Sequence, residues 1–241
     1  SPGKRYRLRD MGDVAEEMAR LHRERGIDFF VFQDDDFFVP RLRTNLERIH
    51  ALADELARRD VAEFAVGVKA RPTDVHPELV DTLVERLHCI EVSLGIENDH
   101  PDDLRALNRN ATPADNQRAL DLLREGHVLD PFNLQLFHPD ATVESLRTNL
   151  AFMERNADAP FNFGRTNLYA GTPILERMLD EGRCEGDYLW WSYRIADPAV
   201  EAAYEVLRRT FGPRTFGVDC VSTRILDDRL RIELVRRFAP G

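Results

Sequence analysis

The sequence has few cysteines and no long apolar segment, and each shortage excludes a class of protein. Its three cysteines, Cys89, Cys184 and Cys220, lie far apart and are odd in number, so they predict reduced thiols and not a disulfide framework or a local metal-binding knuckle. No apolar run approaches the roughly 18–20 residues that a membrane-spanning helix needs, and the charged N-terminus lacks the hydrophobic centre of a signal peptide. We therefore expect a cytoplasmic protein with no membrane partner.

An excess of positive charge is also missing. The formal net charge is −10, which disfavours nucleic acid as a partner. Arginines gather only in small groups at residues 5–9 and 229–237, a pattern more typical of solvated surface than of a phosphate-binding face. A chain of 241 residues that is 43% hydrophobic, without a glycine- or proline-rich tract, can bury one large α/β core.

Short apolar runs alternate with amphipathic segments, which predicts an α/β fold. Strands are expected at residues 27–31, 64–68, 89–96, 131–137 and 161–168, and helices at 12–25, 44–58, 77–87, 112–126, 142–153 and 172–182. Thr44 and Glu47 predict a capping box at the second helix. Because a helix follows each strand, the crossovers should be right-handed and the sheet parallel. Periodicity alone does not decide between an open sheet and a barrel.

The last part of the chain, residues 186–241, changes in character. Aromatic residues gather at 188–193, and Asp197-Pro198 predicts a helix that runs to about Phe211. We expect this extension to cover an end or an edge of the sheet. The paired Trp190 and Trp191 are either packing residues or part of a substrate site.

Polar residues follow every expected strand, at the sheet edge where parallel α/β folds bind ligands. In chain order they are Asp34, Asp35 and Asp36, then Lys69 and Arg71, then Glu97 and Asn98, then His138 and Asp140, then Tyr169. Glu97 and Ser93 are four residues apart on one strand and should share a face. A carboxylate there can accept hydrogen bonds from a ribose diol, or it can simply be solvated; spacing alone favours neither interpretation.

The three consecutive aspartates have two interpretations as well. Carboxylates are ligands for hard cations, and Asp34, Asp36 and His138 around a divalent ion would make a metal-dependent hydrolase. Neighbouring strand residues point to opposite faces, however, and aspartates after a strand often serve as turn and cap residues. The sequence has no H-x-H or H-E-x-x-H arrangement to support the hydrolase.

Four short motifs in succession resemble the radical S-adenosylmethionine (radical SAM) superfamily. They are the segments 32–37 (FQDDDF), 69–72 (KARP), 94–98 (LGIEN) and 169–173 (YAGTP), and the likeness covers roughly residues 4–185. Within the superfamily the sequence is most similar to the group that often carries a cobalamin-binding domain ahead of the radical SAM core. Leu107-Asn108-Arg109 and the turn containing Pro139, Thr142 and Glu144 also resemble the family's pattern.

This resemblance implies a partial (β/α)6 TIM-like barrel with parallel strands, in which SAM lies across the strand ends and a [4Fe–4S] cluster cleaves it to a 5′-deoxyadenosyl radical. The implied SAM-binding residues are Asp34 and Asp35 at the methionine end, Arg71 near the carboxylate or the substrate, Glu97 with Ser93 at the ribose, Gln135 and His138 on and after the next strand, and Tyr169 beside the adenine. No catalytic residue and no metal ligand is assigned. The implied substrate is a small molecule or a peptide, and an upstream domain could bring cobalamin.

The family's CxxxCxxC loop is absent, and the three cysteines, 95 and 36 residues apart, lack the local spacing that holds a cluster. Because residues 1–9 resemble the stretch after the third cysteine of that loop, we expect a truncated barrel at 1–185, without its first strand and cluster loop, and an extension at 186–241. Such a chain would not form the radical by itself. Two explanations stay open: a part of an enzyme that methylates or rearranges an unreactive C–H position, or a naturally degenerate barrel that serves as a binding module.

Overall fold

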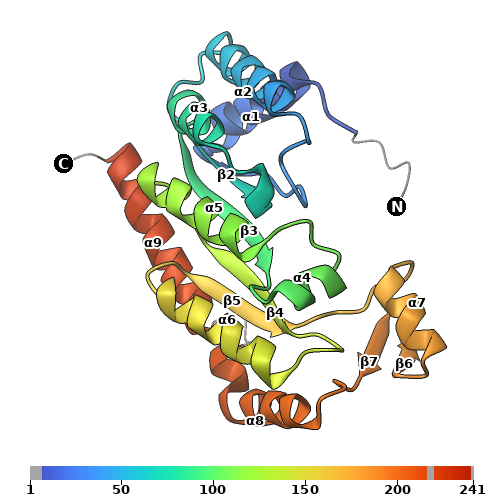
Figure 1. The fold of residues 1–241 in the computed structure, drawn as a ribbon. Helices are drawn as coiled ribbons and strands as arrows, with labels where there is room; N and C mark the ends of the chain where they lie inside the picture. The colour runs from blue at the N-terminus through green and yellow to red at the C-terminus, as the bar shows by residue number, and fades with distance from the viewer. Residues whose placement is uncertain (1–6, 216–219, 240–241) are drawn as a thin grey trace. The chain divides into compact units, whose positions relative to one another are not determined.

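The computed structural model describes residues 7–215 and 220–239. The chain divides into two compact units: unit 1 comprises Ser1–Gly95, Gln117–Pro131 and Asp227–Gly241, and unit 2 comprises Ile96–Asn116 and Phe132–Leu226. Five strands make one sheet in the order β1-β2-β3-β4-β5, which is also their order along the chain (Figure 1).

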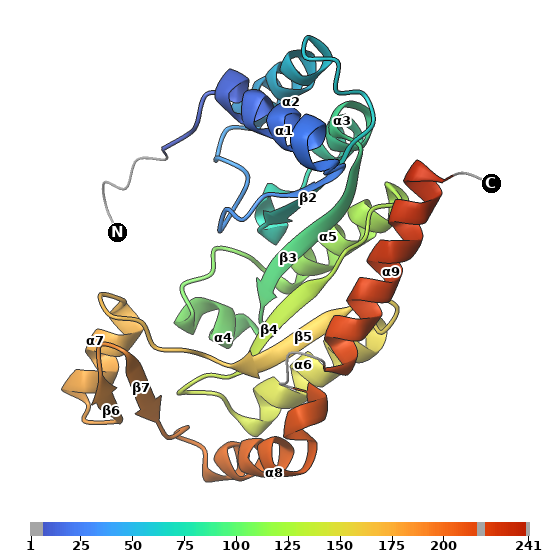
Figure 2. The same ribbon diagram turned by 180° about the vertical axis from the view of Figure 1, so that it is seen from behind.

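Unit 1 contains the first strands and the helices between them. Its elements are α1 (Met11–Arg25), β1 (Phe29–Val31), α2 (Leu42–Ala57), β2 (Ala65–Ala70), α3 (Pro77–Leu87) and β3 (Cys89–Glu97), whose last two residues count with unit 2. Strand β2 pairs in parallel with β1 and with β3. Helix α1 packs on α2, and α2 on α3, as the front and rear views both show (Figures 1 and 2).

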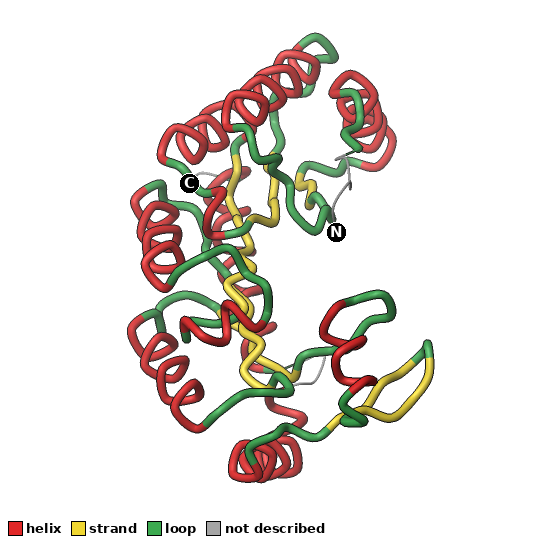
Figure 3. Tube along the Cα trace, turned by 45° about the vertical axis from the view of Figure 1, so that its right-hand side comes forward, coloured by secondary structure: helices red, strands yellow, loops and turns green. Residues whose placement is uncertain are grey.

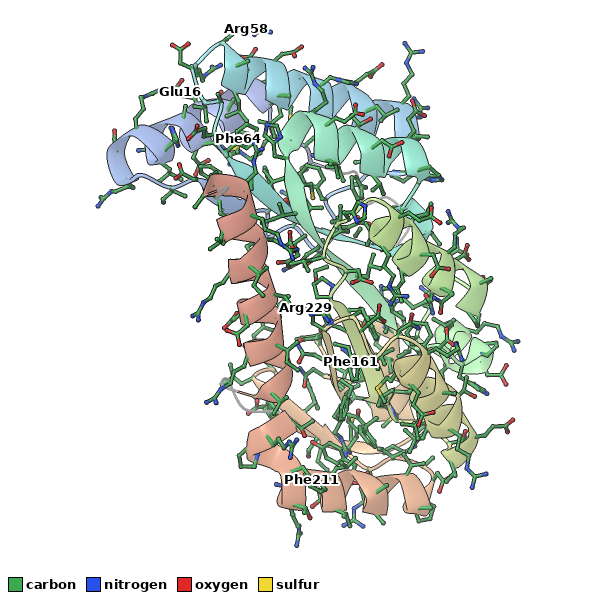
Figure 4. The ribbon with its side chains drawn as sticks, turned by 90° about the vertical axis from the view of Figure 1, so that its left-hand side faces the viewer. Glu16, Arg58, Phe64, Phe161, Phe211 and Arg229 are labelled. Atoms are coloured by element: carbon green, nitrogen blue, oxygen red, sulfur yellow. The ribbon has the colours of Figure 1, made fainter. Side chains whose placement is uncertain are left out.

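Burial in unit 1 follows from the sequence. Five of the six residues of β2 are buried, as expected for a parallel strand covered on both faces. Helix α2 turns Ile49, Leu52 and Leu56 inward at helical spacing. Phe64, labelled in Figure 4, is 3% exposed, and its ring centroid lies 5.1 Å from that of His88.

The ends of helix α1 follow from its sequence, whereas the start of helix α2 differs from the prediction. Helix α1 begins after Asp10, whose carboxylate accepts hydrogen bonds from the amides of Gly12 and Asp13, and Gly26 ends it at φ 63°. The predicted capping box at Thr44 is wrong. Helix α2 begins two residues earlier, at Leu42, so Thr44 lies inside it, and Glu47 pairs with Arg43 at 2.8 Å instead.

Unit 2 holds the remaining strands and most of the C-terminal region. It contains α4 (Pro101–Ala106), β4 (Phe132–Phe137), α6 (Val143–Arg155), β5 (Phe161–Arg165), α7 (Pro173–Asp180), β6 (Cys184–Asp187), β7 (Trp190–Tyr193) and α8 (Pro198–Thr215). Helix α5 (Pro113–Glu125) starts in this unit and continues in unit 1, and α9 (Val221–Phe238) crosses the same division. Strands β4 and β5 are parallel, and the ring of Phe132 in β4 stacks on that of Phe161 in β5 with centroids 5.3 Å apart; Phe161 is labelled in Figure 4.

The C-terminal part of unit 2 packs on its own strands. Helix α8 contacts β4 and α6, and its Val200 is fully buried. The ring of Tyr204 lies 5.1 Å from that of Phe137. Strands β6 and β7 form an antiparallel hairpin that the sequence analysis missed (Figure 3). The Tyr193 hydroxyl, at the end of the hairpin, lies 2.8 Å from the carbonyl of Phe137 and 2.9 Å from that of Thr166.

The predicted α/β class is confirmed: five strands join in one sheet, the pairings β1–β2, β2–β3 and β4–β5 are parallel, and helices lie between the strands along the chain, as in a partial TIM-like barrel. Several boundaries differ from expectation by two to four residues; for example, β5 ends at Arg165 and α8 continues to Thr215. No helix in the described residues is both long and apolar enough to cross a membrane. The predicted division at residue 185 stays a prediction.

Candidate functional site

Strand β3 ends in a tight turn centred on Glu97. The amide of Asn98 donates to the carbonyl of Ile96 at 2.8 Å, and Glu97 has φ 66°. A hydrogen bond between residues i and i+2 around a positive φ is a γ-turn, a rare and strained conformation for a residue with a side chain. Ser93, Gly95 and Glu97 form the less buried alternate positions of β3, so Ser93 and Glu97 share a face, as expected.

The Glu97 carboxylate has a partner that the sequence analysis did not assign. Arg109, which follows α4, places a guanidinium nitrogen 2.6 Å from Glu97 Oε1, and the two side chains are 33% and 15% exposed. The carboxylate is therefore oriented by an ion pair and only partly screened from solvent. The signal was present, because Arg109 closes the Leu107-Asn108-Arg109 motif, but spacing alone gave it no role.

Two other predicted site residues of unit 2 have side chains that could contact a ligand. Gln135, on β4, has a buried side-chain oxygen with no hydrogen-bond partner in the described residues. An acceptor in that state is costly unless a ligand or water supplies a donor. Tyr169 is 65% exposed and lines a cavity of about 440 Å³ made by residues 167–170 and 188–191. The indole nitrogen of Trp191, in the same lining, is also buried and unpartnered within the described part of the chain.

His138 occupies the interior of unit 2. It is 1% exposed, and its Nε2 lies 2.9 Å from Asp103 Oδ2, while His100 Nδ1 lies 3.6 Å from the other oxygen. Burial by itself would raise the pKa of Asp103, but the interactions with His138, Ser145 and His100 together outweigh it and hold that pKa below its usual value. The imidazole thus already has a charged partner, and its predicted contact with a cofactor stays a prediction.

Asp140 follows the same strand and is likewise engaged. Arg183 lies 2.9 Å from its Oδ1, and Arg177 pairs with its Oδ2. Burial opposes ionisation, but hydrogen bonds from the two guanidinium groups dominate and lower the pKa of Asp140. We interpret this cluster as a structural clamp between the loop after β4 and the end of α7.

In unit 1 the aspartates after β1 do not act together. Asp34 and Asp35 are exposed, whereas the Asp36 side chain is 6% exposed and lies 3.2 Å from Arg71 Nε. Asp36 also accepts from the Phe38 amide at 3.1 Å, which is turn chemistry. Burial and the neighbouring Asp36 carboxylate raise the pKa of Asp74 to about 6. Within the described residues, no group of three or more histidine, cysteine or acidic side chains could hold a metal ion.

The cysteines offer no cluster site in the described residues. Within the described residues none of the three forms a disulfide, and Cys89 is buried, donating to the carbonyl of Glu91 at 3.3 Å. Burial raises the pKa of the Cys89 thiol to about 12, which opposes the thiolate that iron coordination requires. These residues therefore do not fit a [4Fe–4S] cluster.

The predicted site residues thus fall into two groups. Unit 2 contains Glu97, Gln135, His138 and Tyr169, and unit 1 contains Asp34, Asp35, Arg71 and Ser93. The structure adds Arg109 to the first group and shows that Arg71 is engaged by Asp36. That one ligand contacts residues of both groups stays a prediction.

Comparison with known proteins adds relatives to this geometry. The anaerobic magnesium-protoporphyrin IX monomethyl ester cyclase of Cereibacter sphaeroides is 25% identical over 179 residues, which cover 73% of this chain and 28% of the cyclase. The radical S-adenosylmethionine methyltransferase TsrM of Kitasatospora setae, solved with cobalamin and a [4Fe–4S] cluster, is 25% identical and superposes with a TM-score of 0.58 over 73% of this chain. The chain is homologous to radical SAM enzymes.

A third likeness concerns the radical SAM fold alone. The cobalamin-dependent radical SAM enzyme OxsB, solved with aqua-cobalamin and S-adenosylmethionine, has a TM-score of 0.71 over 92% of this chain at 11% identity. No family model matches the sequence. The chain spans 28% of the cyclase, 32% of TsrM and 40% of OxsB, so it corresponds to about a third of the radical SAM relatives it matches.

Proposed function

We propose that this chain forms the SAM-binding part of a radical SAM enzyme, and that Glu97 binds the ribose of SAM. The observation that carries the proposal is the Glu97 carboxylate, 15% exposed at the carboxyl end of β3, fixed by a γ-turn and by Arg109. Carboxylates in this state accept strong, charge-assisted hydrogen bonds from a vicinal diol. Parallel α/β folds bind ligands at this edge of the sheet.

The unpartnered acceptor of Gln135 supports an adenosyl ligand. Its buried oxygen needs a donor, and adenosine carries both hydroxyl and amino donors. Tyr169 offers an exposed ring that can lie beside the adenine, as the family resemblance implies. We assign the ribose to Glu97, a nucleoside donor to Gln135 and the base to Tyr169, and we keep His138 among the proposed cofactor-binding residues.

In unit 1, Asp34 and Asp35 are proposed for the methionine end of SAM, with Ser93 at the ribose and Arg71 near the ligand carboxylate. The two aspartates are exposed, and Arg71 is 53% exposed despite its pairing with Asp36. A half-exposed guanidinium in a single ion pair retains free N–H donors for a second carboxylate.

The chemistry of the whole enzyme is proposed from its relatives. In the parent enzyme, a reduced [4Fe–4S] cluster that the three cysteines of this chain do not hold would supply the electron for cleavage of the bound SAM. We propose that the parent enzyme modifies an unreactive C–H position of a small molecule, by methylation or rearrangement. TsrM has been solved with a tryptophan substrate. In this chain the cavity beside Trp190 and Trp191 is our candidate for the substrate position.

Several finer expectations remain part of this proposal. They are the cobalamin-binding domain ahead of the radical SAM core, a peptide as the alternative substrate, a cytoplasmic location, and the boundary between barrel and extension at residue 185. The other interpretation, a binding module without chemistry, makes a different prediction for the gene: a start codon near Ser1 instead of an upstream CxxxCxxC.

The test is a calorimetric titration of the 241-residue chain with SAM. Replacing Glu97 with glutamine keeps the size of the side chain and removes its charge, and we expect SAM affinity to fall about 10–100-fold, the loss typical of hydrogen bonds to a charged group. Glu154→Gln is the matched control, because Glu154 is an exposed glutamate of the same unit. Equal SAM affinity in the wild type and in Glu97→Gln would refute the assignment.

A further inference from the structure

A buried amide network surrounds the two residues that follow Glu97. Asn98 is fully buried, and its side-chain oxygen accepts from Asn149 Nδ2 at 2.9 Å and from the amide of His100 at 2.8 Å. Its main-chain carbonyl accepts from Asn116 Nδ2 at 2.9 Å. Asn116 and Asn149 are themselves fully buried, on α5 and α6, and all of these residues belong to unit 2.

The same two asparagines also bind the next residue along the chain. The amide of Asp99 donates to Asn149 Oδ1 at 2.8 Å, and Asp99 Oδ1 accepts from Asn116 Nδ2 at 3.1 Å. Asn149 therefore uses both ends of its amide, a donor to Asn98 and an acceptor for Asp99. Its donor group also lies 2.8 Å from the carbonyl of Ser145 in its own helix.

These bonds fix the backbone immediately after the strained turn. A residue with a side chain leaves φ 66° readily unless its surroundings determine the conformation. If Glu97 relaxed, Asn98 and Asp99 would move, and several buried donors and acceptors would lose their partners. The network thus holds the turn that sets the direction of the Glu97 side chain.

We propose that Asn116 and Asn149 are positioning residues, which hold the Glu97 carboxylate in the orientation that recognises a ribose diol. This inference rests on the proposed function, because it gives Glu97 its ligand. In this proposal the two asparagines act through Asn98 and Asp99, which they bind, and not through contact with the ligand. Their effect is on selectivity for the diol, which a purely structural role would not change.

The experiment compares two nucleosides that differ only in the diol. Adenosine and 2′,3′-dideoxyadenosine are titrated calorimetrically into the 241-residue chain, and the ratio of their dissociation constants is the readout. We expect the wild type to prefer adenosine about 10-fold or more, the loss associated with one hydrogen bond to a charged acceptor. Glu97→Gln should bring this ratio close to one, and Asn149→Ala should lower it at least to about a third of the wild-type value.

Two further variants complete the design. Asn149→Asp keeps the shape of the side chain and the acceptor for Asp99 but removes the donor to Asn98, so it should lower the ratio even if Asn149→Ala fails to fold. Asn156→Ala is the matched control: Asn156 is also fully buried, at the end of the same helix, where its amide donates to the carbonyl of Phe152 at 3.0 Å. It should preserve the adenosine preference even if thermal stability falls.

The outcomes separate the two claims. Loss of preference in Glu97→Gln and in the Asn149 variants, with preference kept in Asn156→Ala, supports the inference. Loss in Glu97→Gln with an unchanged ratio in the folded Asn149 variants overturns the inference and leaves the proposed function intact. A wild type that binds both nucleosides equally overturns the proposed function, and the inference with it.

Discussion

The carboxyl pair of Asp36 and Asp74 makes a defined prediction for stability. Asp74 is half-buried beside Asp36, whose own side chain is held by Arg71 and by the Phe38 amide. Burial and the Asp36 carboxylate raise the pKa of Asp74 from 3.8 to about 6. Between those two pH values the folded protein keeps a proton that the unfolded chain releases. The free energy of unfolding must therefore fall as pH rises through this window.

The magnitude follows from the size of the shift. A rise of about two pH units corresponds to at most about 3 kcal/mol, because each unit is worth about 1.4 kcal/mol. Solvent screening at a half-buried site reduces this to about 1–2 kcal/mol. Asp74→Asn removes the ionisation and keeps a hydrogen-bonding side chain. We expect the variant to exceed the wild type in unfolding free energy by about 1–2 kcal/mol at pH 8, and by about half as much at pH 5, where the carboxyl group is already ionised in the unfolded chain.

Urea denaturation followed by circular dichroism at pH 5, 6, 7 and 8 measures this difference. Asp81→Asn is the control, because Asp81 is an exposed aspartate on α3 of the same unit, and its difference from the wild type should stay flat. If the difference between Asp74→Asn and the wild type did not change between pH 5 and pH 8, the reasoning about the carboxyl pair would be wrong.

Two further substitutions test packing and charge pairing by thermal and urea denaturation. Asp103→Ala leaves His138 buried without its partner, and we expect the free energy of unfolding to fall by about 2–4 kcal/mol. The control is Asp102→Ala, which removes an exposed pair with Arg105 and should cost under about 0.5 kcal/mol. Similar losses in the two variants would contradict the interior pairing. Gly126→Ala would place a Cβ 2.6 Å from the stiff side chain of Val80, for a cost of about 1–3 kcal/mol. Gly164→Ala meets no atom within 4 Å and should be near neutral, so an equal loss in both glycine variants would refute the clash.

The sequence predicted the alternating part of the fold well and its local exceptions poorly. Strong periodic segments such as α3 and β3 came within a residue of their observed bounds, because burial on one or both faces dictates their pattern. Helix α4 was not predicted, because it has only six residues and two aspartates after its first proline, a composition that is also typical of turns. The hairpin of β6 and β7 was missed because each strand is four residues long and exposed, so it shows no buried alternation.

The sequence predicted which polar residues belong to the candidate site, but not which side chains they pair with. Strand ends identified Glu97 and His138 as polar positions, and the family resemblance added Gln135. The partners of Glu97 and His138 lie on other segments of the chain. Asp103 binds His138 across 35 positions in the chain, and spacing offers no clue to such a contact. The three aspartates after β1 differ for the same reason, because only Asp36 meets Arg71.

The hairpin of β6 and β7 is anchored at its base and exposed at its turn. At the base, Tyr193 reaches two carbonyls of unit 2, and Arg165 stacks on its ring at 4.2 Å. At the turn, Tyr188, Leu189 and Trp190 are between 69% and 86% exposed. Changes in length or composition at the turn would therefore disturb little of the anchored framework. Divergence in this lineage can thus reshape what the cavity admits while the strands beneath it keep their packing.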